Sequence, residues 1–178
     1  DNDEVLAELA RYRAAGLAIG FSVSGPRQAE GIERALGVSV GSERLFDAVQ
    51  VTWNLLEPST GAILQRASEA GLGVIVKEAV ANGRLTSRND SPDFARQRAL
   101  LEEVASELGT TIDALALAAV LAQPWCDVAL SGAARVDHLR SNVAALDVAW
   151  TADIAGRLAA LAEEPEQYWA TRSALEWN

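Results

Sequence analysis

Short apolar runs alternate with segments of helical periodicity along most of the chain. Four runs have the length of a strand and are continuous rather than alternating, namely residues 17–23, 48–53, 72–76 and 127–131. Continuous apolar runs are expected where both faces of a strand are covered. The segments between them place apolar residues three or four positions apart, as a helix requires. A β-α-β-α series of this kind predicts a parallel sheet with right-handed crossovers.

The remaining boundaries follow from proline, glycine and polar clusters. We expect a loop from Asn82 to Ser91, where polar and flexible residues dominate. We expect an irregular C-terminal tail over residues 163–178, which holds Tyr168, Trp169 and Trp177. The predicted helices cover residues 4–15, the segment from Pro26 to Leu36, the segment from Pro58 to the residues before Gly71, residues 91–108, the segment from Thr111 to the residues before Pro124, a helix bearing Leu139, Val143 and Leu146, and a helix bearing Ile154, Leu158 and Leu161.

Four strands in 178 residues make half of a (β/α)₈ TIM barrel, which typically takes ~250 residues. We therefore predict an α/β fold in a single domain over residues 1–178, with four parallel strands alternating with helices. An independent four-stranded open sheet remains an alternative on the pattern alone. The segment from Gly20 to Gly25 does not match the glycine-rich dinucleotide fingerprint, which counts against a Rossmann fold.

Composition excludes several partners. Hydrophobic residues make up 49% and charged residues 22% of the chain, which is enough apolar material for a sizeable core. A formal net charge of −10 disfavours nucleic acid and anionic membranes as partners. No apolar stretch approaches the ~20 residues of a membrane span. The single cysteine, Cys126, cannot form an intrachain disulfide, so we expect a cytoplasmic protein. We predict no metal site.

The sequence contains no methionine, and its first residue is Asp1. A complete translation product begins with methionine. We therefore expect that sequence upstream of Asp1 is missing.

The end of the fourth predicted strand carries the clearest binding signal. In α/β barrels the chemistry lies at the carboxyl ends of the strands. Here the run Leu130 to Arg135 leads directly into a helix, whose first N–H groups attract anions. Arg135 adds a positive charge at that point. The alternative is a Gly-Ala turn without function.

Several segments together resemble the aldo/keto reductase family. The resemblance covers roughly residues 5–147 and implies strands five to eight of that family's barrel. It is carried by residues 20–24 and 47–56 for strands five and six, by 73–85 for strand seven and its loop, and by 116–122, 130–133 and 139–142 for the last helix, strand eight and the cofactor motif.

The resemblance implies a site for a nicotinamide cofactor. Ser24 and Gln50 match residues that hold the nicotinamide carboxamide, although Gly25 replaces the family's asparagine. Lys77 occupies the place of an aromatic residue that usually stacks on the ring. Trp53, on a neighbouring strand, is expected to pack in the core or in a pocket wall.

The same resemblance implies the pyrophosphate and adenosine end of the site. Matching residues are Ser131, Gly132, Ala133 and Asn142, while His138 replaces a glutamine or arginine. A basic residue for a 2′-phosphate falls near Ala134, with Arg135 one place along. The expected cofactor is therefore NADP, with NAD possible.

The resemblance implies that the family's catalytic aspartate, tyrosine, lysine and histidine lie in strands one to four. None of them has a counterpart here, so no catalytic residue is predicted and the chain alone is expected to be inactive. The predicted function is NAD(P)H-dependent reduction of a small carbonyl substrate by a full-length parent, to which this chain contributes the cofactor-binding half. The expected partner is a missing N-terminal half-barrel. The alternatives are a non-catalytic half-barrel that binds another half, or a degenerate relative that binds nucleotide.

Overall fold

The computed structural model describes residues 3–175. Its main sheet contains four parallel strands in the order β1 (Gly20–Ser22), β4 (Ala48–Thr52), β5 (Gly73–Lys77) and β6 (Val128–Ala129). The four predicted strands are therefore confirmed, in an order that follows the sequence. Ala48 lies opposite both Gly20 and Gly73, and Ile75 lies opposite Val128. This register places the carboxyl ends of β1, β4 and β5 at one edge of the sheet.

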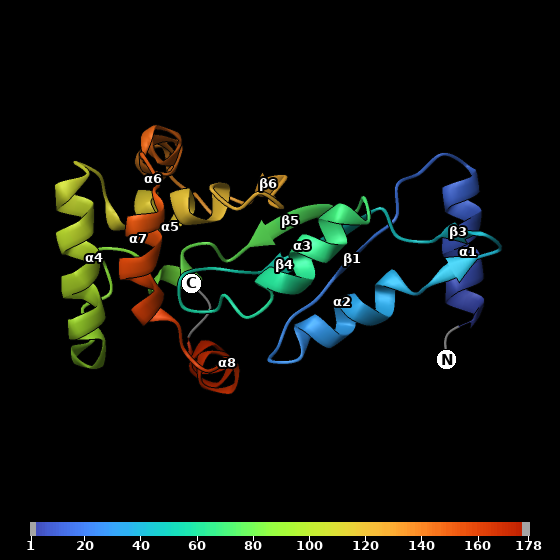
Figure 1. The fold of residues 1–178 in the computed structure, drawn as a ribbon, viewed down its shortest axis with the longest axis horizontal. Helices are drawn as coiled ribbons and strands as arrows, with labels where there is room; N and C mark the ends of the chain where they lie inside the picture. The colour runs from blue at the N-terminus through green and yellow to red at the C-terminus, as the bar shows by residue number, and fades with distance from the viewer. Residues whose placement is uncertain (1–2, 176–178) are drawn as a thin grey trace.

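Helices follow the strands as the periodicity predicts (Figure 1). Each predicted helix has a counterpart, although several are shorter than expected because residues of their first or last turn form a 3-10 turn or a loop. The α-helices are α1 (Asp3–Ala14), α2 (Gln28–Leu36), α3 (Gly61–Glu69), α4 (Ala95–Glu107), α5 (Ile112–Leu121), α6 (Val136–Val143), α7 (Ala152–Leu158) and α8 (Pro165–Ala174).

Only one face of the sheet is well covered within residues 3–175. Val49, Val51, Val74 and Val76 are fully buried on that face, where α3 packs against β5 and α5 against β6. On the other face Thr52 is fully buried, whereas the remaining alternate residues of β4 and β5, Gln50 and Lys77 among them, are only partly buried. The expectation that both faces are covered is therefore wrong for the described residues. We call this second side the open face of the sheet.

The segment beyond residue 163 is not irregular, contrary to the sequence prediction. Pro165 lies in the first turn of α8, where its missing N–H costs nothing. Tyr168 and Trp169 of this helix are buried. Burial of these two aromatic side chains stabilises the helix, although most other residues of the segment are polar. Residues 176–178, including Trp177, lie outside the described residues.

Helix α8 is fixed at the carboxyl ends of β4 and β5. The Nδ2 amide of Asn54, just after β4, donates a hydrogen bond to the Tyr168 hydroxyl at 2.9 Å. Arg172 of α8 pairs with Glu78, just after β5, at 2.6 Å. Arg84 pairs with Glu163, immediately before the helix. These contacts place α8 beside the end of the sheet where α/β barrels bind their ligands.

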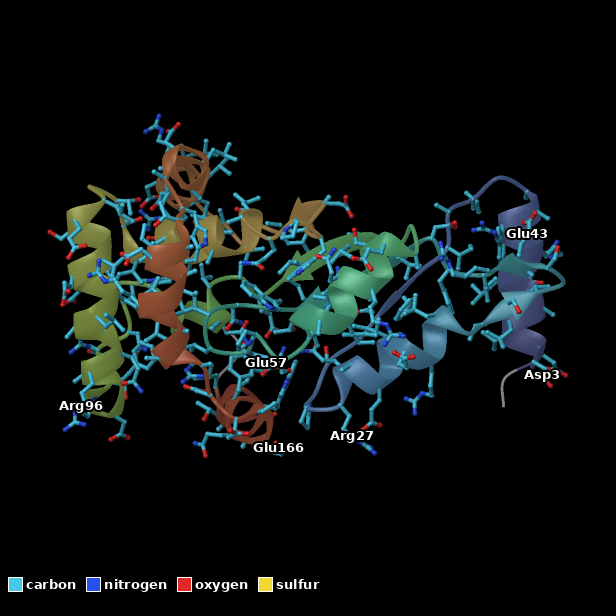
Figure 2. The ribbon with its side chains drawn as sticks, in the orientation of Figure 1. Asp3, Arg27, Glu43, Glu57, Arg96 and Glu166 are labelled. Atoms are coloured by element: carbon cyan, nitrogen blue, oxygen red, sulfur yellow. The ribbon has the colours of Figure 1, made fainter. Side chains whose placement is uncertain are left out.

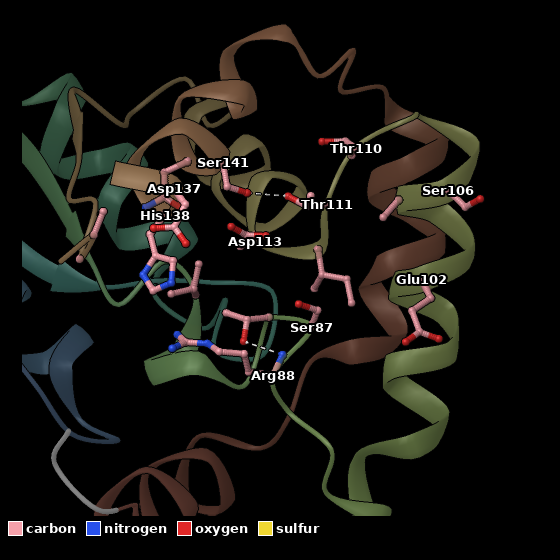
Figure 3. A pocket seen from close by; sticks show the side chains of 17 residues that line it. Ser87, Arg88, Glu102, Ser106, Thr110, Thr111, Asp113, Asp137, His138 and Ser141 are labelled. Carbon is pink, nitrogen blue, oxygen red and sulfur yellow. Dashed lines mark hydrogen bonds between the residues drawn. The ribbon is translucent and has the colours of Figure 1, made fainter. Parts of the chain in front are cut away.

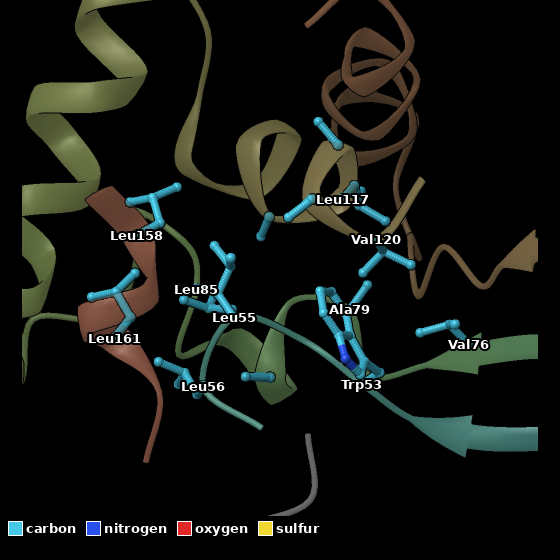
Figure 4. Packing of buried hydrophobic residues seen from close by; sticks show 14 of the residues in the cluster. Trp53, Leu55, Leu56, Val76, Ala79, Leu85, Leu117, Val120, Leu158 and Leu161 are labelled. Atoms are coloured by element: carbon cyan, nitrogen blue, oxygen red, sulfur yellow. The ribbon is translucent and has the colours of Figure 1, made fainter. Parts of the chain in front are cut away.

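The core extends from the sheet to the C-terminal helices. Leu56 and Leu85 lie in the same buried cluster as Leu158, the last residue of α7, and Leu161, in the 3-10 turn after it (Figure 4). Between this core and α8 lies Glu57, a fully buried carboxylate (Figure 2). Its Oε1 accepts hydrogen bonds from Gln28 and Ser59. Burial raises the pKa of Glu57 more than these hydrogen bonds lower it.

A short antiparallel hairpin, β2 (Ser39–Val40) with β3 (Glu43–Arg44), lies near α1 and was not predicted. Gly41 in its turn has a φ of 63°, a conformation that favours glycine.

Within residues 3–175 no single helix is long and apolar enough to span a membrane. The segments Pro92–Glu107 and Ile112–Leu121 together have the length and apolar composition of a span, but they are bent by 81° relative to each other.

Candidate functional site

Three neighbouring strands bring four polar residues together on the open face of the sheet. The ammonium of Lys77, at the end of β5, donates hydrogen bonds to the Ser24 hydroxyl at 2.7 Å and to the Ser22 hydroxyl at 3.2 Å. The Ser22 hydroxyl in turn donates to Oε1 of Gln50 at 3.2 Å. We call these four residues the open-face cluster. It contains Ser24 and Gln50, the two residues expected at a nicotinamide carboxamide.

The cluster follows from strand register and local backbone conformation. Ser22 lies opposite Gln50 in the pairing of β1 with β4. Lys77 lies opposite Thr52, two residues further along β4, so it lies on the same face as Gln50. Gly25 follows Ser24 with a φ of 95°, which an asparagine adopts less readily than glycine. The replacement of asparagine by Gly25 therefore suits this turn.

Lys77 is half-buried, and burial lowers the pKa of its ammonium, with a smaller contribution in the same direction from Arg172. The adjacent Glu78 raises the pKa of Lys77. The Glu78 carboxylate is itself bound by Arg172. Glu78 has a φ of 57°, which a non-glycine residue adopts only where its surroundings fix it, as this ion pair does.

Trp53 belongs to the core, in agreement with the prediction. It is 7% exposed and packs edge-on against Trp125, with ring centroids 5.5 Å apart. Trp53 therefore does not belong to the open-face cluster, although it follows the strand that carries Gln50.

A second site, which we call the α6 pocket, has a volume of about 550 Å³ (Figure 3). It lies between α6, the N-terminal end of α5, helix α4 and the loop after β5. Four residues predicted at a cofactor line it: Gly132, Ala133, His138 and Asn142. A Cβ atom on Gly132 would meet nothing within 4 Å, so the backbone there is open to close approach.

Hydrogen bonds fix two walls of the pocket. Asn142 donates from Nδ2 to the Ser131 hydroxyl at 2.8 Å, so Ser131 holds Asn142 without lining the pocket itself. The hydroxyls of Thr111 and Ser141 are 3.0 Å apart and join α5 to α6. Thr111 also caps α5, accepting from the Ala114 N–H. The pocket wall is therefore built on the ends of helices.

Arg135 lies outside the residues that line the α6 pocket. Its exposed side chain donates to the Asp137 carboxylate at 3.1 Å. Arg135 lowers the pKa of Asp137 most, and the backbone N–H groups of Asp137 and His138 lower it further. The Asp137 carboxylate thus interacts with the first N–H groups of α6, the groups expected to attract a phosphate.

Arg88 is a pocket residue that the sequence argument missed. It follows β5 in the segment predicted as a loop, and its side chain lines the α6 pocket together with Thr86 (Figure 3). The Thr86 hydroxyl donates to the Gly83 carbonyl at 2.8 Å and accepts from the Arg88 N–H at 3.3 Å, which shapes the loop. The available signal was a cation preceded by two hydroxyl residues, Thr86 and Ser87, in the loop after a strand.

The two sites offer different chemistry. The open-face cluster supplies an ammonium, two hydroxyls and an amide, which suit a neutral carboxamide or carbonyl oxygen. The α6 pocket supplies a guanidinium, hydroxyls and an amide, which suit a phosphate and the edge of a base. It is also lined by three carboxylates, of Glu102, Asp113 and Asp137, which repel an anion. Within residues 3–175 no group of His, Cys, Asp and Glu side chains is arranged to hold a metal.

Neither tyrosine side chain belongs to the open-face cluster or lines the α6 pocket, so neither can act as a proton donor there. Tyr12 lies on α1 and is 43% exposed, while Tyr168 is fully buried. Burial raises the pKa of Tyr168 more than its hydrogen bond from Asn54 lowers it.

Comparison with known proteins gives a consistent result. A model of the aldo/keto reductase family matches residues 1–163. An aldo-keto reductase from Bacillus halodurans, in its apo form, superposes with a TM-score of 0.73 at 22% identity, covering 92% of this chain and 58% of that one. Its holo form gives a TM-score of 0.70 at 22% identity, with coverages of 91% and 56%. At these identities the likeness shows the fold.

A thermostable aldo-keto reductase crystallised with the inhibitor epalrestat gives a TM-score of 0.65 at 27% identity, covering 88% of this chain and 53% of that one. The chain thus spans little more than half the length of these similar structures. A search of curated proteins gave no match.

Proposed function

The chain belongs to the aldo/keto reductase family, and from this we propose that it forms the cofactor-binding part of an oxidoreductase that reduces small carbonyl compounds with NAD(P)H. The observation that carries the proposal is the α6 pocket. It joins four residues implied by the family resemblance to a cation, Arg88, that comes from a different part of the chain.

Each end of the cofactor has a candidate partner. In the proposal, Arg88 and the backbone N–H of Gly132 bind phosphate, while the N–H of Ala133 donates to the Ser131 carbonyl. Asn142, held by Ser131, reads the adenine edge. His138 lines the same pocket and contacts the adenosine part. Ser24 and Gln50 of the open-face cluster hold the carboxamide.

The bound cofactor supplies the hydride, and the residues of this chain orient it. No described residue of the open-face cluster is a tyrosine acid, and Tyr168 is buried. We therefore propose that the proton is supplied by residues outside this chain's two sites, on four further β-α units that pair with the open edges of β1 and β6. The chain by itself is then inactive.

We also propose that a preference for NADP over NAD depends on Arg135. The guanidinium of Arg135 donates a hydrogen bond to the Asp137 carboxylate. Arg135 contributes to a 2′-phosphate when that pair opens, and otherwise the pocket accepts NAD equally well.

The test is a fluorescence titration of NADH and NADPH against the purified chain. Arg88→Ala should weaken both cofactors roughly tenfold, because a charge-assisted hydrogen bond is worth more than a neutral one. Asn142→Ala should weaken both about fivefold, as expected for one hydrogen bond of ~1 kcal/mol.

Arg140→Ala is the matched control, since Arg140 lies on α6 but is exposed and does not line the pocket. Equal effects of Arg88→Ala and Arg140→Ala would contradict the assignment of the pocket. The same preparations should not oxidise NADPH in the presence of aldehydes beyond a heat-treated control.

A second candidate function is an interaction module without catalysis. Exposed apolar side chains on α6 favour it, since Val136, Leu139 and Val143 are each at least half exposed. Cofactor binding to the isolated chain, with the effects above, separates the two functions.

A further inference from the structure

Lys77 is the only lysine in the sequence, and it lies in the open-face cluster. Its ammonium contacts Ser24 directly and reaches Gln50 through the Ser22 hydroxyl. A fixed cation is thus built into the group of residues to which the proposed function assigns the nicotinamide carboxamide.

The charge of Lys77 is not neutralised locally. No ion pair with Lys77 occurs among the described residues, whose contacts to its ammonium are the two serine hydroxyls. The adjacent carboxylate, Glu78, is bound by Arg172 at 2.6 Å. Glu78 and Arg172 act on the pKa of Lys77 in opposite directions, and their charges offset each other because they are paired. The cluster therefore keeps the positive charge of Lys77.

The nicotinamide ring differs in charge between its two redox states. The oxidised ring is a cation, whereas the reduced ring is neutral, and the rest of the cofactor is the same in both. A fixed cation beside the ring therefore weakens binding of the oxidised form alone. The effect is stronger at a partly desolvated site than in bulk water.

We propose that Lys77 sets the redox-state preference of the nicotinamide site, so that the chain binds the reduced cofactor more tightly than the oxidised one. This inference rests on the proposed function, because it places the ring at the open-face cluster. In an enzyme that reduces carbonyl compounds, such a preference favours uptake of the reduced cofactor and release of the oxidised one.

The experiment compares NADH, NAD⁺ and ADP-ribose by isothermal titration against the full chain and two variants. ADP-ribose lacks the nicotinamide ring, so it reports the α6 pocket alone. Lys77→Met removes the charge at similar length, and Lys77→Arg retains it. In Lys77→Met the ratio of the NAD⁺ and NADH dissociation constants should fall by on the order of tenfold, mainly through tighter NAD⁺ binding. In Lys77→Arg the ratio should stay close to that of the unmodified chain.

The affinity for ADP-ribose should be the same in all three proteins, which verifies that both variants fold and keep the α6 pocket. An unchanged ratio in Lys77→Met, or an equal change in Lys77→Arg, with ADP-ribose still bound, would overturn the role of Lys77 and leave the proposed function standing. Failure of the unmodified chain to bind ADP-ribose and NADH would overturn the proposed function and this inference with it.

Discussion

At the scale of single residues, Asp137 opposes the anion-binding character of α6. Its carboxylate interacts with the first N–H groups of the helix and also binds Arg135. The first N–H groups of α6 and the Arg135 guanidinium are thus already engaged from within the chain, and Arg88 is the cation that lines the pocket itself. Asp137 lines the α6 pocket, so an incoming phosphate meets a like charge there.

Asp137→Asn should therefore tighten binding of NADPH and of inorganic pyrophosphate severalfold, because it removes the repulsion and releases Arg135. Isothermal titration at low ionic strength measures the effect. Asp153→Asn is the matched control, since Asp153 lies in the first turn of α7 and does not line the pocket. Weaker pyrophosphate binding in Asp137→Asn would show that Asp137 positions the helix instead of repelling the ligand.

Some residues of the two sites could be predicted from the sequence, and others could not. Resemblance to a family identified Gly132, Ala133, His138 and Asn142, and they do line one pocket. The contact of Lys77 with Ser24 depends on the register of three strands, which local pattern does not specify. Arg88 belongs to a loop, where no periodicity indicates the direction of a side chain.

At the scale of elements, the strands were predictable and the last helix was not. Each strand of the main sheet coincides with a continuous apolar run. The run is a usable signal because strand positions such as Val49 and Val74 are fully buried and therefore carry apolar side chains. In α8 the buried residues are the adjacent pair Tyr168 and Trp169, with no apolar stripe around them. A pattern of that kind carries no helical period. The hairpin of β2 and β3 has only two residues per strand, too few for a periodic signal.

Tyr168→Phe should lower the free energy of unfolding by about 1 kcal/mol, because it leaves the buried Asn54 amide without one of its acceptors. Chemical denaturation monitored by circular dichroism measures the loss. Tyr12→Phe, at the other tyrosine of the sequence, is the control and should change stability little, since Tyr12 is exposed. Equal stability of the two variants would mean that α8 is held by its ion pairs and by Trp169 alone.

At the scale of the whole molecule, exposed apolar side chains occur near both ends of the chain. Val128 of β6 and Leu130 just after it, together with Leu139 and Val143 of α6, are each at least 40% exposed. Toward the N-terminus, Val5 of α1, Leu17 and Val40 of β2 are also exposed. Among residues 3–175, β1 and β6 each pair with one neighbour only, which leaves two free strand edges in the main sheet. Unpaired edges flanked by apolar surface promote association.

We therefore expect the isolated chain to self-associate, and the apolar face of α6 to contribute. Leu139→Lys places a charge at a position that is 50% exposed and should shift the chain toward monomer, with little loss of folding stability. Ala170→Lys adds the same charge at an exposed position of α8, away from both edges, and should leave association unchanged. Sedimentation velocity over a range of protein concentrations measures both effects.

A sharp monomer boundary for the unmodified chain at every concentration, together with a cooperative melt, would show instead that this open sheet is stable without further strands. Because a cation at position 139 leaves the α6 pocket lining unaltered, the Leu139→Lys monomer should still bind ADP-ribose, and that binding separates a loss of assembly from a loss of fold.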